Sequence, residues 1–411
     1  MRRVVVTGLG VITPLGNDTD TLFSALMAGQ SGVRVIAGEG PRGPFTGVGA
    51  PVQFDPAHYF PPQQRIDQID RVSQFSLAAA SMAVSDAGIS FTDDNRDKAG
   101  VSMGTGMGSS LTLEETFTQL LLRDPDRVKP LTVLKVMNNA SAGHIAIQYG
   151  LAGPDLTYSC ACSSSSVAIG EAFRQIRHGY ADVMIAGGAE AELAFGFFKS
   201  WEAMKIMAIP DRTNPSASCR PFSKNRSGLV LGEGAAVVVL EEREAAMGRG
   251  ARIYAELAGY GSSNDYLHIT KPSVEGQARA MTLALDDAGL TAADVDYVNA
   301  HGTATALNDV TETRAIKQLL GERAYKVPVS STKSMHGHLL GGAGALEFVI
   351  SLLAMHRRAV PPTAHLDVPD PECDLDYVPG LGRADQDLRC VMSNSFAFGG
   401  TNAVLVARQP S

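Results

Sequence analysis

Strongly apolar runs alternate with alanine-rich amphipathic segments along the chain. Residues Arg3–Thr7 are rich in β-branched side chains, and Val183–Ala186 and Ala235–Leu240 are apolar without a break, as in strands buried on both faces. Val72–Ala87 places apolar residues at helical spacing and stops at Gly88. Strands and helices that alternate in this way predict an α/β fold.

The same succession of elements occurs twice. Val4–Gly10 and Tyr254–Gly261 both have the pattern of a strand that ends in a glycine turn. Each half then has a strand that runs into a polar loop, at Ala99–Gly108 and at Val295–Thr305. Chance similarity between glycine- and alanine-rich strands is the alternative explanation. We expect two similar halves that divide near Gly250, residues 1–250 and residues 251–411.

Composition limits the classes of protein and partner. The chain has 411 residues, of which 45% are hydrophobic, and this is enough to bury a core without disulfides. Its net charge of −8 lacks the basic excess of nucleic-acid-binding domains, so nucleic acid is not an expected partner. The apolar stretch Leu229–Leu240 is too short to span a bilayer and is interrupted by Glu233. Two segments rich in proline and glycine, Gly38–Pro44 and Pro361–Pro371, are predicted to be surface connections.

The cysteines and the N-terminus favour a cytoplasmic protein. Five cysteines are an odd and sparse set, which argues against a disulfide framework. The first residues enter a strand pattern directly, with no apolar leader before it. We therefore expect a soluble cytoplasmic protein that has no contact with a membrane.

Cys162 lies where a predicted strand gives way to a helix that starts with Ser163–Ser166. Unpaired N–H groups at a helix N-terminus favour a thiolate and can hold an oxyanion, so we expect a lowered thiol pKa. The alternative is a small buried hydrophobe. Cys160 and Cys162 could also form half of a metal site, but no second cysteine pair lies at ligand spacing. We expect no metal.

Two histidines follow strands in the second half. His301 comes after the apolar run Val295–Ala300, and His338 lies in a loop that the repeat makes equivalent to that of Cys162. Either histidine alone fits a structural role. A cysteine and two histidines at equivalent strand ends predict an active site, since ligands of open α/β sheets gather there. The nearby acids Asp309, Glu312 and Glu347 are expected to orient neighbours or hold loops.

Two glycine-rich loops have more than one interpretation. Ser393–Asn402 could be a tight turn before a last strand at Ala403–Ala407, or a mobile gate hinged at Gly399 and Gly400. Gly104–Gly108 superficially resembles a dinucleotide loop, but it lacks the full spacing and a downstream ribose-binding acid. We therefore expect no dinucleotide.

Taken together, these stretches resemble the type II β-ketoacyl-[acyl-carrier-protein] synthases, free-standing condensing enzymes of the thiolase superfamily. The resemblance runs nearly from end to end, and its motifs occur in family order. They are Ala161-Cys162-Ser163-Ser164, His301-Gly302-Thr303-Ala304-Thr305, Lys333-Ser334-Met335-His336-Gly337-His338 and Gly399-Gly400-Thr401-Asn402. The resemblance implies a thiolase-like duplicated αβαβα sandwich, usually a homodimer. It also implies substrates carried on the phosphopantetheine of an acyl carrier protein, and no bound cofactor.

The resemblance also implies roles for single residues. Cys162 would take the acyl chain, His301 and His338 would assist decarboxylation of the malonyl thioester, and Lys333 would support His338. The oxyanion hole would combine the N–H groups of Cys162 and Phe398. The residues implied to contact substrate are Thr303 and Thr305 on the pantetheine arm, Phe398 as a gate, and Met107 in the acyl pocket.

The chain departs from the family pattern in four places. Cys160 and His336 each replace a threonine, Ala397 replaces a glycine before the gating Phe398, and a usually basic docking helix contains a single cation, Arg65. These changes leave open a specialised polyketide or polyene pathway, or a non-catalytic chain-length partner subunit. Other cations could form a docking patch for an acidic carrier, namely Arg127, Lys129, Lys205 and Lys271.

Overall fold

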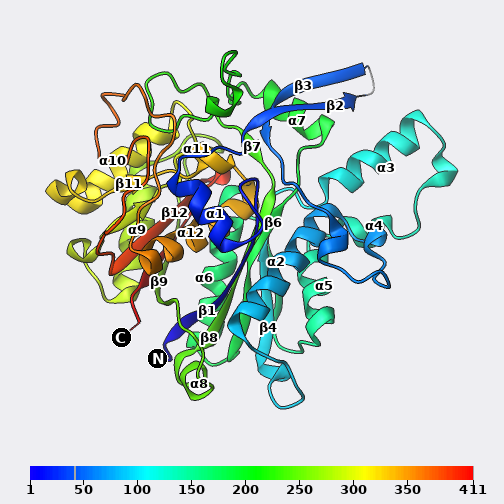
Figure 1. Ribbon diagram of the computed structural model, residues 1–411, viewed down its shortest axis with the longest axis horizontal. Coiled ribbons are helices and arrows are strands. Elements are labelled where there is room, and N and C mark those ends of the chain that lie inside the picture. The colour runs from blue at the N-terminus through cyan, green and yellow to red at the C-terminus, as the bar shows by residue number, and fades with distance from the viewer. Residues whose placement is uncertain (41–42, 411) are drawn as a thin grey trace.

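The computed structural model describes residues 1–40 and 43–410, and its core is one ten-stranded mixed sheet (Figure 1). Two five-strand sets meet where β1 pairs antiparallel with β9. The strand order is β11 (Val329–Ser330), β10 (Tyr297–Asn299), β12 (Cys390–Phe396), β13 (Thr401–Arg408), β9 (Ala255–Asn264), β1 (Val4–Ile12), β8 (Gly234–Glu242), β6 (Val183–Glu190), β4 (Ala99–Gly104) and β5 (Asp155–Tyr158).

The two sets repeat one pairing pattern outward from their junction. In each, the first three strands are antiparallel neighbours, β1–β8–β6 in one and β9–β13–β12 in the other. Two parallel strands complete each set, β4 and β5 or β10 and β11. The duplicated α/β sandwich expected from the sequence is therefore confirmed. The boundary between residues 1–250 and 251–411 stays a prediction, since one sheet runs through both parts.

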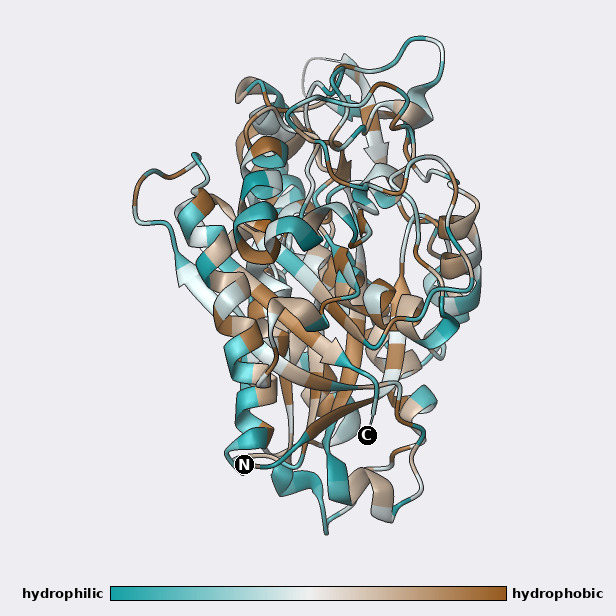
Figure 2. Cartoon of the chain, turned by 90° about the vertical axis from the view of Figure 1, so that its left-hand side faces the viewer, coloured by the Kyte–Doolittle hydropathy of each residue, from teal (hydrophilic) through white to brown (hydrophobic). Residues whose placement is uncertain are grey.

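Helices form three layers around the two halves of the sheet. α6 (Ser164–Arg177) and α12 (Ala343–Arg357) contact strands of both halves and form the middle layer. Every residue of α12 up to Met355 is buried, as expected for a helix with sheet on two sides. Figure 2 shows the hydrophobic colouring concentrated on the strands and inner helices. The outer layers contain α2 (Arg71–Ala87) with α5 (Ala140–Tyr149), and α9 (Val274–Ala288) with α10 (Asn308–Leu320).

The expectation that the first strand ends in a glycine turn at Gly8–Gly10 is wrong, because β1 continues to Ile12. The glycines serve close packing against α2: a Cβ on Gly8 would lie 2.1 Å from the carbonyl oxygen of Ala83, and one on Gly10 would lie 1.9 Å from that of Ala79. In β9, Gly259 and Gly261 face α9 in the same way. The glycine pattern therefore marks helix–strand contact at equivalent places in both halves.

Two loop predictions also need correction. Part of Gly38–Pro44 belongs to a hairpin of β2 (Arg34–Gly40) and β3 (Gly43–Ala50), while residues 41 and 42 lie outside the described residues. In Pro361–Pro371, residues 361–364 are buried, because they pack behind the segment after β11. There the hydroxyl of Thr363 accepts a hydrogen bond of 3.0 Å from the backbone N–H of Ser331.

The remaining elements surround the sheet: α8 lies at the end where the chain begins, α7, β7 and α11 lie towards the opposite end, and α3 projects to one side (Figure 1). None of the helices in the described ranges combines the length and the apolar character that crossing a bilayer requires. These elements are α1 (Thr19–Met27), α3 (Ser110–Leu122), α4 (Thr132–Val136), α7 (Phe195–Ala203), β7 (Leu231–Gly232), α8 (Arg243–Gly248) and α11 (Lys333–His336).

Candidate active site

Cys162 lies in a tight turn between β5 and α6. The turn is a single 3₁₀ segment, Ala161–Ser163, and α6 starts at the next residue. The hydroxyl of Ser164 accepts a hydrogen bond from the backbone N–H of Cys160 and donates one to the carbonyl of Ala161. Ala161 has a φ of 48°, which is strained for a residue with a Cβ. The turn holds Cys162 at the helix start, as the sequence predicted, with 7% of the residue exposed.

His301 follows β10 and is held by two acids of α10. The carboxylate of Glu312 accepts hydrogen bonds of 2.8 Å from the backbone N–H groups of His301 and Gly302. Asp309 accepts one of 3.1 Å from the N–H of Thr303. The expectation that Asp309 and Glu312 hold this loop is confirmed.

His338 comes from the equivalent loop after α11. Its backbone N–H donates to the carbonyl of Val230 at 2.7 Å, and its carbonyl accepts from the N–H of Gly232 at 2.9 Å. Both ring nitrogens are buried and have no hydrogen-bond partner among the described residues. Burying an imidazole whose nitrogens have no hydrogen-bond partner costs free energy of folding. These nitrogens are therefore free to form hydrogen bonds with a bound ligand.

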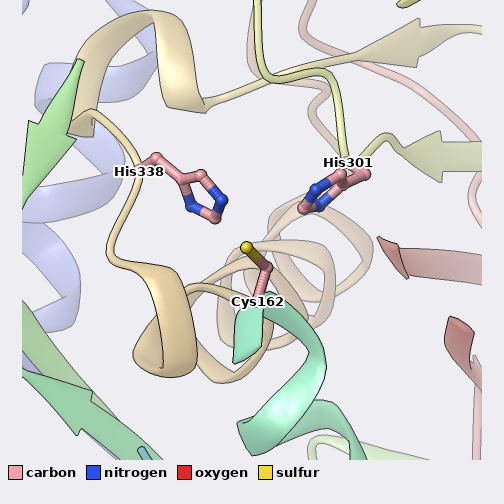
Figure 3. A group of neighbouring side chains, drawn as sticks. All are labelled: Cys162, His301 and His338. Carbon is pink, nitrogen blue, oxygen red and sulfur yellow. The ribbon is translucent and has the colours of Figure 1, made fainter. Parts of the chain in front are cut away.

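The fold brings Cys162, His301 and His338 together. Figure 3 shows the sulfur of Cys162 pointing between the two imidazoles, each of which comes from a different loop. The sulfur and one nitrogen of each ring all lie within 4.8 Å of one another. The ring centroids of the histidines are 5.4 Å apart, and the rings cross at 81°. Both histidines are 2% exposed.

The expected low pKa of Cys162 is wrong for this state of the site. Burial raises the pKa of the thiol to about 12, although Lys333 and a hydrogen bond from the backbone N–H of Phe398 lower it. The N-terminus of α6 is therefore not sufficient to offset the loss of hydration around a buried thiolate. Cys162 rests as a thiol.

The two imidazoles are neutral. Burial, and then the charge of Lys333, lower the pKa of His301 and of His338 well below the ordinary histidine value. The ammonium of Lys333 lies 3.4 Å from Nδ1 of His301. Because an ammonium only donates, Nδ1 is the acceptor and the ring proton is on Nε2. His301 thus offers one N–H donor.

Lys333 is fully buried and its hydrogen bonds go to His301 and Glu347. It donates to the backbone carbonyl of His301 at 2.6 Å and forms an ion pair with Glu347. Burial raises the pKa of Glu347 to about 7, even though Lys333 lowers it. The resemblance linked Lys333 with His338, but the structure links the two through charge rather than through a hydrogen bond.

A pocket of about 330 Å³ leads to the cluster. Thr303, Thr305 and Phe398 line it, and the two threonine hydroxyls lie 2.8 Å apart. Met107 does not line this pocket; it packs instead against the apolar cluster that contains Cys162.

Of the expected docking cations, Lys205 and Lys271 line the pocket. Arg127 and Lys129 lie beside α3 instead, each paired with a neighbouring acid.

The N-terminal domain model of β-ketoacyl synthases matches residues 1–246, and the C-terminal domain model matches residues 254–367. The chain belongs to the β-ketoacyl synthase family. It is 43% identical to a 3-oxoacyl-[acyl-carrier-protein] synthase 2 of Synechocystis, over 99% of this chain and 98% of the relative. It is 44% identical to nodulation protein E of Rhizobium meliloti, over 99% of both chains.

A solved ketosynthase complex has the same fold. The type II polyketide synthase complex AntDE:AntF, described as an acyl-carrier protein with its ketosynthase bound to the hexaketide, matches with a TM-score of 0.91. Its sequence is 34% identical, and the match covers 100% of both chains. The thiolase-like α/β assignment is confirmed by this similarity.

Sequence reasoning missed two buried acids of the site. The carboxylate of Glu190, at the end of β6, accepts hydrogen bonds from Gly106, Met107 and Gly341 backbone N–H groups at 2.7–3.0 Å. Glu192 is 0% exposed. Burial and the charge of Glu190 raise the pKa of Glu192 well above its ordinary value, although a hydrogen bond with the side chain of Trp201 lowers it. The sequence signal was two glutamates at the end of an apolar strand.

The site residues also include types that bind metal ions. Cysteine and histidine are zinc ligands, and the spacing of Cys162, His301 and His338 is compatible with a shared ion. The expectation that the protein binds no metal therefore stays a prediction.

Proposed function

We propose that this protein is a β-ketoacyl-[acyl-carrier-protein] synthase that elongates a fatty acyl chain by two carbons. The observation that carries the proposal is a buried thiol whose sulfur lies within 4.8 Å of a nitrogen of each of two neutral imidazoles, at the end of a pocket. Each group supplies what one step of the condensation needs. The relatives named 3-oxoacyl-[acyl-carrier-protein] synthase 2 support the same reaction.

In the first half-reaction Cys162 takes the acyl chain. Its sulfur attacks the carbonyl carbon of the acyl thioester, and the bond from that carbon to the carrier's sulfur breaks. The thiol proton leaves with the carrier as its free thiol. The backbone N–H groups of Cys162 and Phe398 would hold the oxyanion, and the hydrogen bond of Phe398 to the thiol places one donor there already.

In the second half-reaction the malonyl thioester loses CO₂. The electron pair of the broken carbon–carbon bond passes into an enolate, whose carbon attacks the acyl carbonyl on Cys162 and releases the sulfur. A neutral imidazole carries no charge of its own and can stabilise the enolate oxygen by donating its N–H as a hydrogen bond. The lowered pKa values of His301 and His338 suit this role, because they keep both rings neutral. Lys333 would keep both rings neutral and fix the tautomer of His301.

Substrate contacts follow from the lining of the pocket. Thr303 and Thr305 would bond the pantetheine arm, and Phe398 would control entry to the cluster. Met107, which packs against the apolar cluster that contains Cys162, would limit the length of the acyl chain. No bound cofactor or metal is needed for this scheme.

The proposed partner is an acyl carrier protein, in both its acyl- and malonyl-loaded forms. Lys205 is exposed at the end of α7, and Lys271 also lines the pocket, so both are placed to meet an acidic carrier. The neighbour AntDE:AntF is a ketosynthase with an acyl-carrier protein, which supports the same kind of partner here.

A homodimer and a cytoplasmic location belong to the same proposal. β5 ends the sheet, and within the described chain its outer edge pairs with no strand. The nearby α3–α4 region exposes large apolar side chains, with Phe117 at 55%, Leu121 at 76% and Val133 at 69%. A second copy would cover both features.

The state of the cysteines supports the proposed cytoplasmic location. All five cysteines are free thiols, as expected in a reducing compartment.

Neither alternative is favoured. A non-catalytic partner subunit has no need of an intact cysteine–histidine cluster with unpartnered ring nitrogens. A specialised polyketide or polyene pathway would use the same chemistry, and nothing in the geometry of Cys162, His301 and His338 selects it over fatty acyl elongation.

The test is intact-protein mass after incubation with acyl-carrier proteins of increasing chain length. We expect one acyl adduct on Cys162 with medium and long saturated chains, and none on the Cys162→Ala variant. Cys160→Ser is the matched control and keeps the adduct. An adduct on Cys160, or no adduct from any saturated chain on the folded protein, overturns the proposal.

A further inference from the structure

Trp201 is the only tryptophan of the chain, and it lies in the pocket of Cys162. Its indole stacks on the ring of Phe398, with centroids 6.2 Å apart and planes at 22°. The two aromatic residues come from opposite halves of the protein, Trp201 from α7 and Phe398 from the turn between β12 and β13. One aromatic contact therefore joins a helix of the first half to the candidate gate.

The helix side of this contact is firmly anchored. Glu114 of α3 accepts hydrogen bonds from the backbone N–H groups of Phe195 and Gly196 at the start of α7. One turn before Trp201, Phe198 is 1% exposed and packs against Phe45 with ring centroids 5.8 Å apart. These contacts hold the part of α7 that precedes Trp201.

The Phe398 side has the backbone of a hinge. Gly399 and Gly400 have φ values of 84° and 78°, and a Cβ on Gly399 would meet no atom within 4 Å. The turn is held by backbone hydrogen bonds, from the N–H of Gly399 to the carbonyl of Ile269 and from the N–H of Asp265 to that of Gly400. Glycine at both positions allows this backbone other conformations once those hydrogen bonds break, so the contacts of the Phe398 ring help to keep the turn in its present conformation.

An acyl chain would compete for the same indole. Cys162 and Trp201 belong to one apolar cluster, together with Phe198, Leu229 and Leu340. A chain carried on the sulfur of Cys162 is apolar and would lie against this cluster. It would then contact the indole in place of Phe398.

We infer that Trp201 is a positioning residue, which holds Phe398 in its resting place and keeps malonyl-carrier protein from the histidines until Cys162 is acylated. The inference rests on the proposed function. Without Trp201, malonyl thioester would reach His301 and His338 in the absence of an acyl chain. It would lose CO₂, the carbon–carbon electron pair would form an enolate, and the enolate would take a proton from water to give acetyl thioester.

The experiment measures this unproductive decarboxylation with malonyl-carrier protein alone. We expect Trp201→Leu to raise its rate about three- to ten-fold, the range of one aromatic contact, while acylation of Cys162 changes less than about two-fold. Trp201→Phe, which keeps a ring, restores the low rate. Lys199→Ala, on the same helix and paired with Glu202 outside the pocket, is the control and matches the wild-type protein.

A second measurement uses the indole itself as a probe. Because Trp201 is the sole tryptophan, its emission reports the contact with Phe398. Acylation with a tryptophan-free carrier protein is expected to shift the emission, and the Phe398→Ala variant without acyl chain is expected to show the same shift. These emission measurements test the inference even if the Trp201→Leu variant does not fold.

Separate outcomes distinguish the two claims. No acylation of Cys162 in the wild-type protein defeats the proposed function. If the wild-type protein condenses normally, an unchanged decarboxylation rate in Trp201→Leu overturns the inference alone. An equal loss of acylation and decarboxylation assigns Trp201 a structural role, and emission that is unaffected by acylation also overturns the inference.

Discussion

Lys333 and Glu347 form an ion pair in the interior of the protein, and both side chains are 0% exposed. The same ammonium donates to the carbonyl of His301 and lies beside its ring. A buried ion pair is costly to form, because both charges lose their hydration. In this protein the ion pair holds the positive charge of Lys333 next to two imidazoles, and this charge helps to keep them unprotonated.

Removing Lys333 is expected to leave Glu347 buried without a partner. Lys333→Ala should lower the free energy of unfolding by about 3–5 kcal/mol, the usual cost of breaking a buried pair. Urea unfolding measures it. The double variant Lys333→Met, Glu347→Leu removes both charges and should recover most of the stability but not the condensation activity. A single variant as stable as the wild-type protein would contradict the ion pair.

Cys162→Ala is expected to abolish condensation, because in the part of the chain that is described no other thiol forms such a close cluster with both histidines. The fold should stay intact, since the substitution removes one small sulfur atom from the cluster. Product analysis with acyl- and malonyl-carrier proteins measures the loss, and Cys160→Ala serves as the control. Chain elongation by Cys162→Ala would rule out the assigned nucleophile.

Ala397→Gly is expected to act on the gate. Ala397 precedes Phe398, and its N–H donates to the carbonyl of Thr401 at 3.0 Å, so a more flexible residue there loosens the turn. The malonyl half-reaction should change by more than acyl transfer to Cys162, when each is measured in a single turnover. Equal changes in both would argue against a gate at Phe398.

His336 provides a test by pH. Burial and Lys333 lower its pKa to about 3, while an unfolded chain takes up this proton near the ordinary value of 6.5. Below pH 6.5 the unfolded state therefore binds a proton that the folded state does not, and stability falls as the pH falls. At pH 5 this one group should cost about 2 kcal/mol relative to pH 7.

The variant His336→Thr lacks this proton-binding group. Its free energy of unfolding should drop between pH 7 and pH 5 by about 2 kcal/mol less than that of the wild-type protein. His58→Thr, at a position with 77% of the side chain exposed, controls for the loss of an imidazole as such. Parallel pH curves for the wild-type and His336→Thr proteins would show that His336 is charged or hydrated in the folded state.

Much of this architecture could be predicted from the chain. Local pattern located helix α2 to within one residue, because its apolar spacing and the C-terminal Gly88 are both local signals. The repeat predicted two halves with Cys162 and His338 at equivalent ends, because equivalent strand positions impose similar sequence constraints. The glycines of β1 were noticed in the sequence but were interpreted as a turn. A glycine that lets a neighbouring helix pack closely against a strand has the same local sequence pattern as a glycine that forms a turn.

The tertiary structure decided what the local sequence could not. The pKa of Cys162 depends on how completely other segments bury it, and this burial outweighs the effect of its own helix. The contacts of Trp201 with Phe398 and of Glu190 with Gly341 join residues far apart in the chain, so no short-range pattern encodes them. The sequence by itself determined the elements and the chemistry available at their ends. Only packing fixed which charges are shielded from water and which side chains meet.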